Sequence, residues 1–190
     1  MPTNIRAYMS ILQGQILVAR PFLNDGEFKR TVILLAEHNE QGSLGFILNK
    51  SMHLTLKDVL PGMDDLKIPV YYGGPVAQNQ LFYIHTAGKE ISDSLHIQSN
   101  YYWSGNFAEV IEALKNRRLS PTQIRFFIGY SGWGEGQLAK ELEEKAWASL
   151  DSYTSEILNK HPEDMWPEQV ARLGANYKVF ADTPQEPSLN

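Results

Sequence analysis

The sequence contains no cysteine, and this absence excludes several kinds of site at once. Without cysteine there is no disulfide framework, no thiolate metal ligand and no cysteine nucleophile. Long apolar runs are missing too, since no stretch approaches the roughly 18–20 residues that span a bilayer. The first residues lack a basic start followed by a long apolar stretch, so no secretory leader is predicted. We therefore expect a cytoplasmic protein without membrane contact.

A basic stripe, which duplex-binding surfaces usually carry, is also missing. The net charge is −5, and residues 135–168 alone hold nine acidic residues against three lysines. The one local basic group consists of Lys115, Arg117, Arg118 and Arg125, and no aromatic residues are interleaved with it. We expect no direct binding of nucleic acid by this chain.

Length and composition favour a single folded domain. The 190 residues fall within the range of roughly 100–200 residues that is usual for one domain. Hydrophobic residues make up 43% and charged residues 21%, so the chain can bury a full core. We expect one domain over residues 1–181. Residues 182–190 are predicted to form a loose tail, because they hold two prolines and no apolar periodicity.

Short apolar runs rich in valine, isoleucine, phenylalanine and tyrosine predict the strands. These runs lie at residues 15–19, 31–38, 45–48, 70–72, 81–85, 125–130 and 177–181. The residues between the second and third runs are short and turn-forming, which predicts a β-hairpin with Gly42 at a positive φ.

Apolar residues at helical spacing predict three main helices and one short helix. The main helices are predicted to follow Asn106 and to span about 136–147 and about 163–173, with the short one at 55–60. Asn106 and Glu109 resemble a capping box, and Pro167 is expected in the first turn of the third helix. Strands and long helices do not alternate regularly, so an α+β domain fits better than a doubly wound parallel sheet.

Residues 129–138 (GYSGWGEGQL) place four glycines between a predicted strand and a predicted helix. A phosphate loop is one interpretation, because helix N-termini attract anions. The spacing of Gly132, Gly134 and Gly136 matches neither the dinucleotide pattern nor the nucleotide-triphosphate loop, and Glu135 would repel a phosphate. A phosphate site is therefore disfavoured, and no cofactor is predicted.

A nucleophile elbow is the second interpretation of this segment. The elbow pattern G-x-S-x-G is broken by Trp133, and a nucleophilic Ser131 would also need a base. His38 and His85 each end an apolar run, where backbone hydrogen bonding is the more common role. The five histidines lack metal-ligand spacing, so no metal site is predicted.

A tight packing corner is the third interpretation, and the residue chemistry favours it. Glycine permits close approach of two backbones, so Gly132 and Gly134 are expected to allow tight packing. Trp133 is expected to fill the space between the helix and the sheet.

The GYSGWGEGQL segment, with Glu141 and Trp147 after it, resembles the signature of the YqgE/AlgH family, also known as DUF179 or UPF0301. Other blocks match in the same order: residues 15–21 (QILVARP), Phe28 with 31–38 (TVILLAEH), 42–49 (GSLGFILN), 71–76 (YYGGPV) and 81–85 (LFYIH). The resemblance covers about residues 11–174. It implies an α+β fold with a mixed, largely antiparallel sheet that is curled into a barrel-like core and flanked by helices.

The resemblance to this family does not imply that the protein catalyses any particular chemical reaction. Some family members carry the name of transcriptional regulator through a genetic link to alginate production, and the family offers no recognised DNA-binding module. The sequence departs from the commoner family pattern at Ala139, where many relatives have an acid, and at Lys145, where glycine is frequent. Alanine is also common at the position of Ser131, which weakens a nucleophilic role for its hydroxyl.

The resemblance also suggests that three glycine-rich blocks share one pocket. The candidate pocket or motif residues are His38, Asn49, Gly73, Gly74, Pro75, His85, Gly129, Tyr130, Ser131, Gly132, Trp133, Gln137 and Glu141. The alternative is that Asn49, Gln137 and Glu141 cap turns and helix ends.

The favoured function is a non-catalytic cytoplasmic regulatory or interaction module that acts through a protein partner or a small ligand. The alternative is a hydrolase-type enzyme with a pocket near His85, Ser131 and Glu141. The sequence assigns no oligomeric state.

Overall fold

The computed structural model describes residues 11–151 and 157–183 and has the expected α+β architecture. The strands are β1 (Ile16–Ala19), β2 (Val32–Asn39), β3 (Gly42–Ile47), β4 (Ser51–Thr55), β5 (Pro69–Tyr72), β6 (Val76–His85), β7 (Leu95–Gln98), β8 (Tyr101–Trp103), β9 (Ile124–Gly134) and β10 (Trp147–Leu150). The helices are α1 (Leu56–Val59), α2 (Phe107–Lys115), α3 (Gln137–Glu143), α4 (Pro162–Arg172) and α5 (Ala175–Ala181).

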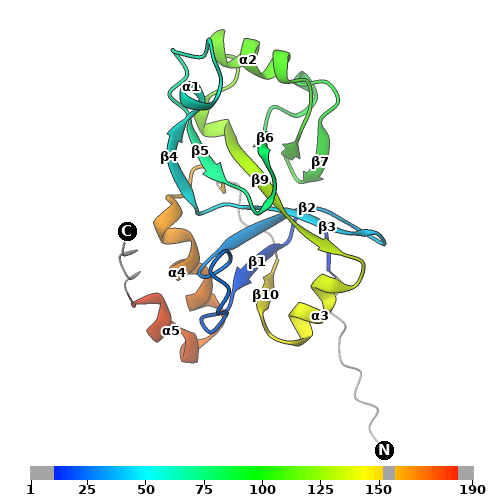
Figure 1. Cartoon of the computed structure of the whole chain (residues 1–190), viewed down its shortest axis with the longest axis vertical. Coiled ribbons are helices and arrows are strands. Elements are labelled where there is room, and N and C mark those ends of the chain that lie inside the picture. The colour runs from blue at the N-terminus through cyan, green and yellow to red at the C-terminus, as the bar shows by residue number, and fades with distance from the viewer. Residues whose placement is uncertain (1–10, 152–156, 184–190) are drawn as a thin grey trace, which may run out of the picture.

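Strand β9 connects two halves of one sheet (Figure 1). The strand order is β10-β1-β2-β3-β9-β6-β8-β7, and β5 pairs with both β4 and β9. The β5–β9 pairing is parallel and the other pairings are antiparallel, so the expectation of a largely antiparallel sheet is confirmed. The barrel-like closure is not formed, because β10 and β7 remain the two ends of the strand order.

Three clusters of buried side chains hold the helices against the sheet. The first contains Phe46 of β3 and Trp166 of α4, and the second contains Phe126 of β9 and Leu114 of α2. The third lies under β1, β2 and β3 and includes Leu138 of α3. Each cluster combines strand residues with one face of a helix, so the core positions the helices relative to β9.

The predicted helix over 136–147 is too long. Helix α3 ends at Glu143, and Lys145 adopts a positive φ of 60°. Trp147 then opens β10 and pairs with Ala19 of β1, so pairing with a distant strand overrides the local helical spacing.

The predicted strand over 177–181 is wrong, because these residues lie in helix α5. Tyr177 and Phe180 are three residues apart and both pack against the first core cluster, as residues on one helix face do. From residue 184 onwards the predicted tail lies outside the described residues.

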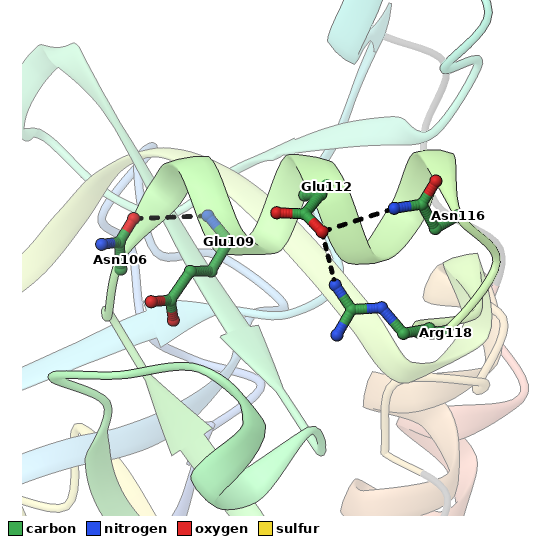
Figure 2. A network of polar contacts seen from close by, with 5 residues as sticks. All are labelled: Asn106, Glu109, Glu112, Asn116 and Arg118. Carbon is green, nitrogen blue, oxygen red and sulfur yellow. Dashed lines mark hydrogen bonds and ion pairs between the residues drawn. The ribbon is translucent and has the colours of Figure 1, made fainter.

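Local signals are confirmed at the hairpin and at α2. Gly42 has a φ of 143° in the β2–β3 turn. The Asn106 side chain accepts a hydrogen bond from the Glu109 N–H at 3.3 Å, as Figure 2 shows. The Glu109 carboxylate bonds Ser92 rather than Asn106, so half of the predicted capping box is present. Pro167 lies inside α4, not in its first turn, which Pro162 occupies.

The local basic group does not form one exposed patch. Arg118 is paired with Glu112 at 3.0 Å at the end of α2 (Figure 2). Arg125 is 4% exposed, and its guanidinium donates to the carbonyls of Leu48, Leu158 and Lys160. Arg125 therefore fixes the segment before α4 to β9 instead of facing solvent.

No helix in the described part of the chain combines the length and the apolar character that crossing a membrane requires.

Candidate functional site

Between β5 and β6 the chain crosses over β9, and glycines at positions 73, 74 and 129 allow the two backbones to touch there. Both β5 and β6 pair with residues 126–128 of β9, so they occupy opposite edges, and residues 73–75 pass from one edge to the other. A Cβ atom on Gly73 would lie 2.2 Å from the Gly129 oxygen, and one on Gly129 would lie 2.3 Å from the Gly74 oxygen. These separations are below any real Cβ contact, so only glycine lets the two backbones touch here.

Ser131 serves this same crossing. Its side chain is fully buried, and its hydroxyl donates a hydrogen bond to the Gly73 carbonyl at 3.1 Å. Pro75, which follows the crossing, is exposed. The YGGP and GYSG blocks therefore meet in space, and the Ser131 hydroxyl is directed at a backbone carbonyl there.

One carboxylate fixes α3 to the far end of β9. Glu141 Oε2 accepts hydrogen bonds from the indole N–H groups of Trp133, at 2.9 Å, and Trp147, at 2.8 Å. Glu141 Oε1 accepts from Gln137 Nε2 at 2.9 Å, and Gln137 Oε1 accepts from the Gly134 N–H at 3.0 Å. The two indole rings pack edge to face with centroids 6.0 Å apart. We name this set the Trp–Glu cluster (Trp133, Gln137, Glu141 and Trp147).

The packing interpretation is right for Trp133, partly right for Gly132 and wrong for Gly134. Trp133 is 6% exposed and lies in the third core cluster with α3. Gly134 has no positive φ, and the nearest atom to a Cβ added there would be Gln137 Oε1 at 3.9 Å. At Gly132 the nearest atom would be Tyr130 Cε2 at 3.3 Å, again without a positive φ. Contact between two backbones occurs instead at the crossing, whereas Gly132 is approached closely only by the Tyr130 ring and Gly134 is open.

Gly132 and Gly134 lie on an exposed part of the sheet surface that has few side chains. Gly134 pairs with Gly42 across the β3–β9 ladder, and Gly132 pairs with Leu44. Alternation along a strand places Gly132 and Gly134 on the face opposite to Trp133. We name this surface the glycine trough (Gly42, Leu44, Gly132 and Gly134).

Two further strands border the glycine trough. On β2, Glu37 pairs with Leu44 and Asn39 pairs with Gly42. On the other side lie Tyr130 and Val76, whose Cγ2 atom is 3.7 Å from the position of a Cβ on Gly132. Figure 1 shows the far ends of β2, β3 and β9 extending to one side of the molecule, beside α3.

His85 lies at the opposite end of β9 and has a structural environment. It is fully buried and pairs with Ile124. Nδ1 accepts from the Ala87 N–H at 3.3 Å and Nε2 lies 3.1 Å from the Ser104 carbonyl, which fits a neutral ring protonated at Nε2. Burial lowers the pKa of His85, and the Ser104 hydrogen bond opposes this effect.

The hydrolase site predicted near His85, Ser131 and Glu141 is not assembled. At about 3.3 Å per strand residue, Ser131 lies roughly 23 Å along β9 from the level of His85. Glu141 is committed to the two indoles beyond that point. A nucleophile and its base must lie within hydrogen-bond reach of each other, and these residues do not.

His38 and Asn49 lie outside the glycine crossing as well. His38 Nδ1 and Ser43 Oγ are 2.7 Å apart across the β2–β3 hairpin. The Asn49 amide accepts from the Val32 N–H at 2.8 Å and donates to the Arg30 carbonyl at 2.9 Å. Asn49 therefore caps a turn, as its alternative interpretation predicted. The candidates do not share one pocket: they divide between the crossing, the Trp–Glu cluster, the glycine trough and these separate positions.

A polar hollow of about 450 Å³ lies beside the start of α4. It is lined by Arg30, Asn49, Pro162, Glu163, Trp166, Pro167, Ala181, Asp182 and Thr183. The Arg30 guanidinium lies 4.3 Å from the Trp166 ring centroid and donates to the Thr183 carbonyl at 2.7 Å. Burial lowers the pKa of Arg30. Asn49 is the one sequence candidate among the lining residues, and the other walls come from distant segments without a common motif that the sequence could show.

In the described ranges, no group of three or more histidine, aspartate or glutamate side chains is placed to hold a metal ion. The polar side chains of Asn49, Ser131, Gln137 and Glu141 bind other parts of the protein instead.

Comparison with known proteins assigns this architecture to one family. A family model described as "AlgH-like" (DUF179) matches residues 16–178. A "UPF0301 protein" of Cytophaga hutchinsonii is 40% identical over 95% of this chain and 100% of its own length. A "UPF0301 protein" of Parabacteroides distasonis is 41% identical over 94% of this chain and 91% of its own length.

Two solved structures share the fold. The solution structure of the AlgH protein from Pseudomonas aeruginosa has a TM-score of 0.72 and 28% identity, and the match covers 98% of this chain and 100% of that one. A crystal structure from Corynebacterium diphtheriae has a TM-score of 0.75 and 22% identity, with 96% and 95% of the two chains covered.

Proposed function

The chain belongs to the AlgH-like family, and from this premise we propose that it is a non-catalytic cytoplasmic interaction module that binds a protein partner at the glycine trough. The observation that carries this proposal is that Gly132 and Gly134 are exposed in an ordinary strand conformation and that the space next to Gly134 is open. Glycine inside a strand often marks a place where another backbone approaches closely.

The two glycines weaken the strand that contains them. A glycine in a strand interior is less stable than an alanine by roughly 0.5–1 kcal/mol. At Gly73, Gly74 and Gly129 the crossing explains why no side chain is present. A Cβ on Gly132 would come close only to the Tyr130 ring, at 3.3 Å, and one on Gly134 would meet no atom closer than 3.9 Å. An approaching partner supplies the reason that the isolated fold does not.

The surroundings of the trough keep its shape fixed. Beneath it, the Trp–Glu cluster joins Trp133 of β9 to α3 and β10 through hydrogen bonds to Glu141. Next to it, Gly73 and Gly129 lock the chain crossing through direct backbone contact. A surface that is already ordered before binding loses less conformational entropy when a partner arrives.

The placement of the candidate catalytic residues supports a non-catalytic role. Ser131 donates to a backbone carbonyl, His85 is buried at the other end of β9, and Glu141 accepts from two indoles. The three side chains are each used in holding the fold together.

The absence of cysteine makes a position-specific crosslinking test direct. Glu135→Cys places one thiol beside Gly134, and Gly26→Cys places one at an exposed control position with open space around its Cβ. Each variant carries a benzophenone maleimide and is irradiated in lysate of the source cells. We expect a discrete protein adduct from position 135 that is absent from position 26.

A second substitution tests whether the trough itself holds the partner. Gly134→Val in the Glu135→Cys background adds a branched side chain to the floor where the space is open. We expect the adduct to disappear while the melting temperature stays within a few degrees of its original value. Identical adducts from positions 26 and 135, or an adduct that survives Gly134→Val, would contradict the proposed function.

A further inference from the structure

The polar hollow beside the start of α4 is large enough for a small molecule. Its volume of about 450 Å³ lies within the range of roughly 300–1,000 Å³ that ligand sites have in proteins. Its walls come from the segments before β2 and after β3, from the first two turns of α4 and from the end of α5. Figure 1 shows α4 and α5 on the side of the molecule away from α3 and the glycine trough. The hollow is therefore a second candidate site, independent of the proposed function.

Arg30 supplies a positive charge that the fold holds in one place. Its guanidinium lies 4.3 Å from the centroid of the Trp166 ring, and Nη2 donates to the Thr183 carbonyl at 2.7 Å. Trp166 is 3% exposed, and its indole N–H donates to the Ala19 carbonyl at 2.8 Å, so the ring under Arg30 is itself fixed. A guanidinium keeps its charge at physiological pH and matches the geometry of a carboxylate.

The backbone of Arg30 is held in an unusual conformation. Its φ is 56°, in the left-handed region that residues with a Cβ rarely adopt. The Asn49 amide donates to the Arg30 carbonyl at 2.9 Å and accepts from the Val32 N–H at 2.8 Å, so it holds both sides of this turn. Strained backbone of this kind is concentrated at binding and catalytic sites. The fold therefore positions the guanidinium before any ligand arrives.

Two carboxylates line the same hollow. Glu163 and Asp182 are exposed, and within residues 11–151 and 157–183 neither side chain takes part in a hydrogen bond or an ion pair. Their charges are available to a positively charged group of a ligand. Pro162, Pro167 and Ala181 form uncharged parts of the wall, which suit a short aliphatic group.

Charges of both signs restrict the chemistry of an occupant. A simple anion bound to Arg30 would also lie near two carboxylates, and a simple cation bound to those carboxylates would lie near the guanidinium. A molecule that has both a carboxylate and an ammonium group can face each charge of the wall with a charge of the opposite sign.

We propose that the polar hollow binds a small zwitterion, a free amino acid or a compound of the same chemistry. Arg30 holds its carboxylate, and Glu163 and Asp182 hold its ammonium group. The aliphatic part of the ligand lies against the proline and alanine side chains of the wall. The ligand binds without a covalent step, so the site selects a molecule by its two charges and its size.

Calorimetric titration of the full chain with a panel of the common free amino acids tests this inference. Each amino acid that binds is compared with two analogues that keep its side chain. The N-acetyl form lacks the ammonium group, and the carboxamide lacks the carboxylate. We expect saturable binding of at least one free amino acid, and binding about ten-fold or more weaker for both analogues, because each has lost a charge-assisted contact.

Substitutions locate the site on the protein. Arg30→Gln should weaken binding of the free amino acid about ten-fold or more and make the acid and its carboxamide bind alike. Lys29→Gln, at the exposed neighbouring position outside the hollow, should change neither. Glu163→Gln and Asp182→Asn should each weaken binding about two- to five-fold, as exposed ion pairs do, whereas Asp164→Asn on the same turn of α4 should not.

The melting temperature of each variant is measured first, because Arg30→Gln also removes a contact with Trp166. If Arg30→Gln does not fold, the variants at Glu163 and Asp182 decide the question, since substitutions at these exposed positions leave the fold intact.

The contrary outcomes are distinct from one another. The proposal is overturned if no amino acid binds saturably, if the free amino acid and its two analogues bind equally, or if acetate displaces the amino acid at the same concentration. Binding that is unchanged in the Glu163 and Asp182 variants places the ligand elsewhere on the protein. Binding that occurs only after residues 184–190 are removed shows that the full chain does not take the ligand. All these outcomes leave the crosslink from position 135 unaffected, so failure of this site and failure of the proposed function are told apart.

Discussion

Replacing Glu141 by alanine removes a carboxylate that two buried indole groups share. Trp133 and Trp147 are 6% and 2% exposed, and both indole N–H groups donate to Glu141 Oε2. A buried donor without an acceptor costs about 1–3 kcal/mol, so leaving both indole donors without their acceptor should destabilise the fold by about 2–6 kcal/mol. Loss of the Gln137 contact adds little, because Gln137 is exposed.

The assay is urea unfolding followed by tryptophan fluorescence. In a protein of this size, each kcal/mol lost from the free energy of unfolding also lowers the melting temperature by roughly 2–4 °C. Glu141→Gln keeps one oxygen acceptor for the two indoles and should lose about 1 kcal/mol, since the indole hydrogen bonds remain while the charge and the exposed Gln137 contact are lost. Glu143→Ala, at an exposed position on the same helix, is the matched control and should change stability by less than about 0.5 kcal/mol.

The reasoning fails if Glu141→Ala and Glu143→Ala unfold at the same urea concentration. That result would mean that both indoles find water or another acceptor without cost. A loss as large in Glu141→Gln as in Glu141→Ala would also contradict it, because the charge and not the acceptor would then hold the cluster together.

Three further predictions concern the crossing, the buried histidine and the charge distribution. Gly129→Ala should destabilise the protein by about 2–5 kcal/mol, because the φ of Gly129 is 71° and the new Cβ would meet the Gly74 oxygen at 2.3 Å. The control Gly134→Ala should leave stability unchanged or raise it by up to about 1 kcal/mol in the same urea titration. Burial lowers the folded-state pKa of His85 below its ordinary value of 6.5, so the unfolded chain binds the proton more readily than the folded chain does. The neutral His85 therefore contributes to stability above pH 6.5, and this contribution should be lost as the pH falls below that value. His85→Gln should flatten the dependence of unfolding free energy on pH, whereas the exposed control His53→Asn should keep it. Anisotropy titration with duplex DNA at physiological salt should show weak binding without sequence preference, because Arg125 is buried and Arg118 is paired; a nanomolar, sequence-dependent complex would refute this.

Elements specified by neighbouring residues could be predicted from the sequence. The β2–β3 hairpin follows from a short turn with Gly42 at a positive φ, and the start of α2 follows from the Asn106 cap. Elements specified by distant partners could not. Trp147 continues a helical pattern but joins β1 as a strand, and the β-rich run at 177–181 becomes a helix against α4.

The candidate site shows the same division between local and distant causes. The glycine blocks and Trp133 stand out in the sequence, and the packing of Trp133 follows from its size. Which glycines are crowded depends on the contact between residues 73–74 and Gly129, and no local pattern reports that contact. The register shift between Leu35 and Glu37, which places Glu37 opposite Leu44, also depends on the pairing of two whole strands.

The residue composition of β9 changes at the point where the strand is no longer fully buried, and this change bears on the proposed function. From Ile124 to Phe127 the strand is buried between β5 and β6, whereas at Ser131–Gly134 β3 is its one paired neighbour among the described strands. Natural proteins usually protect exposed strand ends with lysine, proline or a covering element. Here the Gln137 side chain accepts a hydrogen bond from the Gly134 N–H, and the face opposite to Trp133 has Gly132 and Gly134 in place of larger side chains. The edge of β9 is therefore protected at Gly134 while its face is left with small residues on a rigid support, which is the arrangement that the proposed function requires.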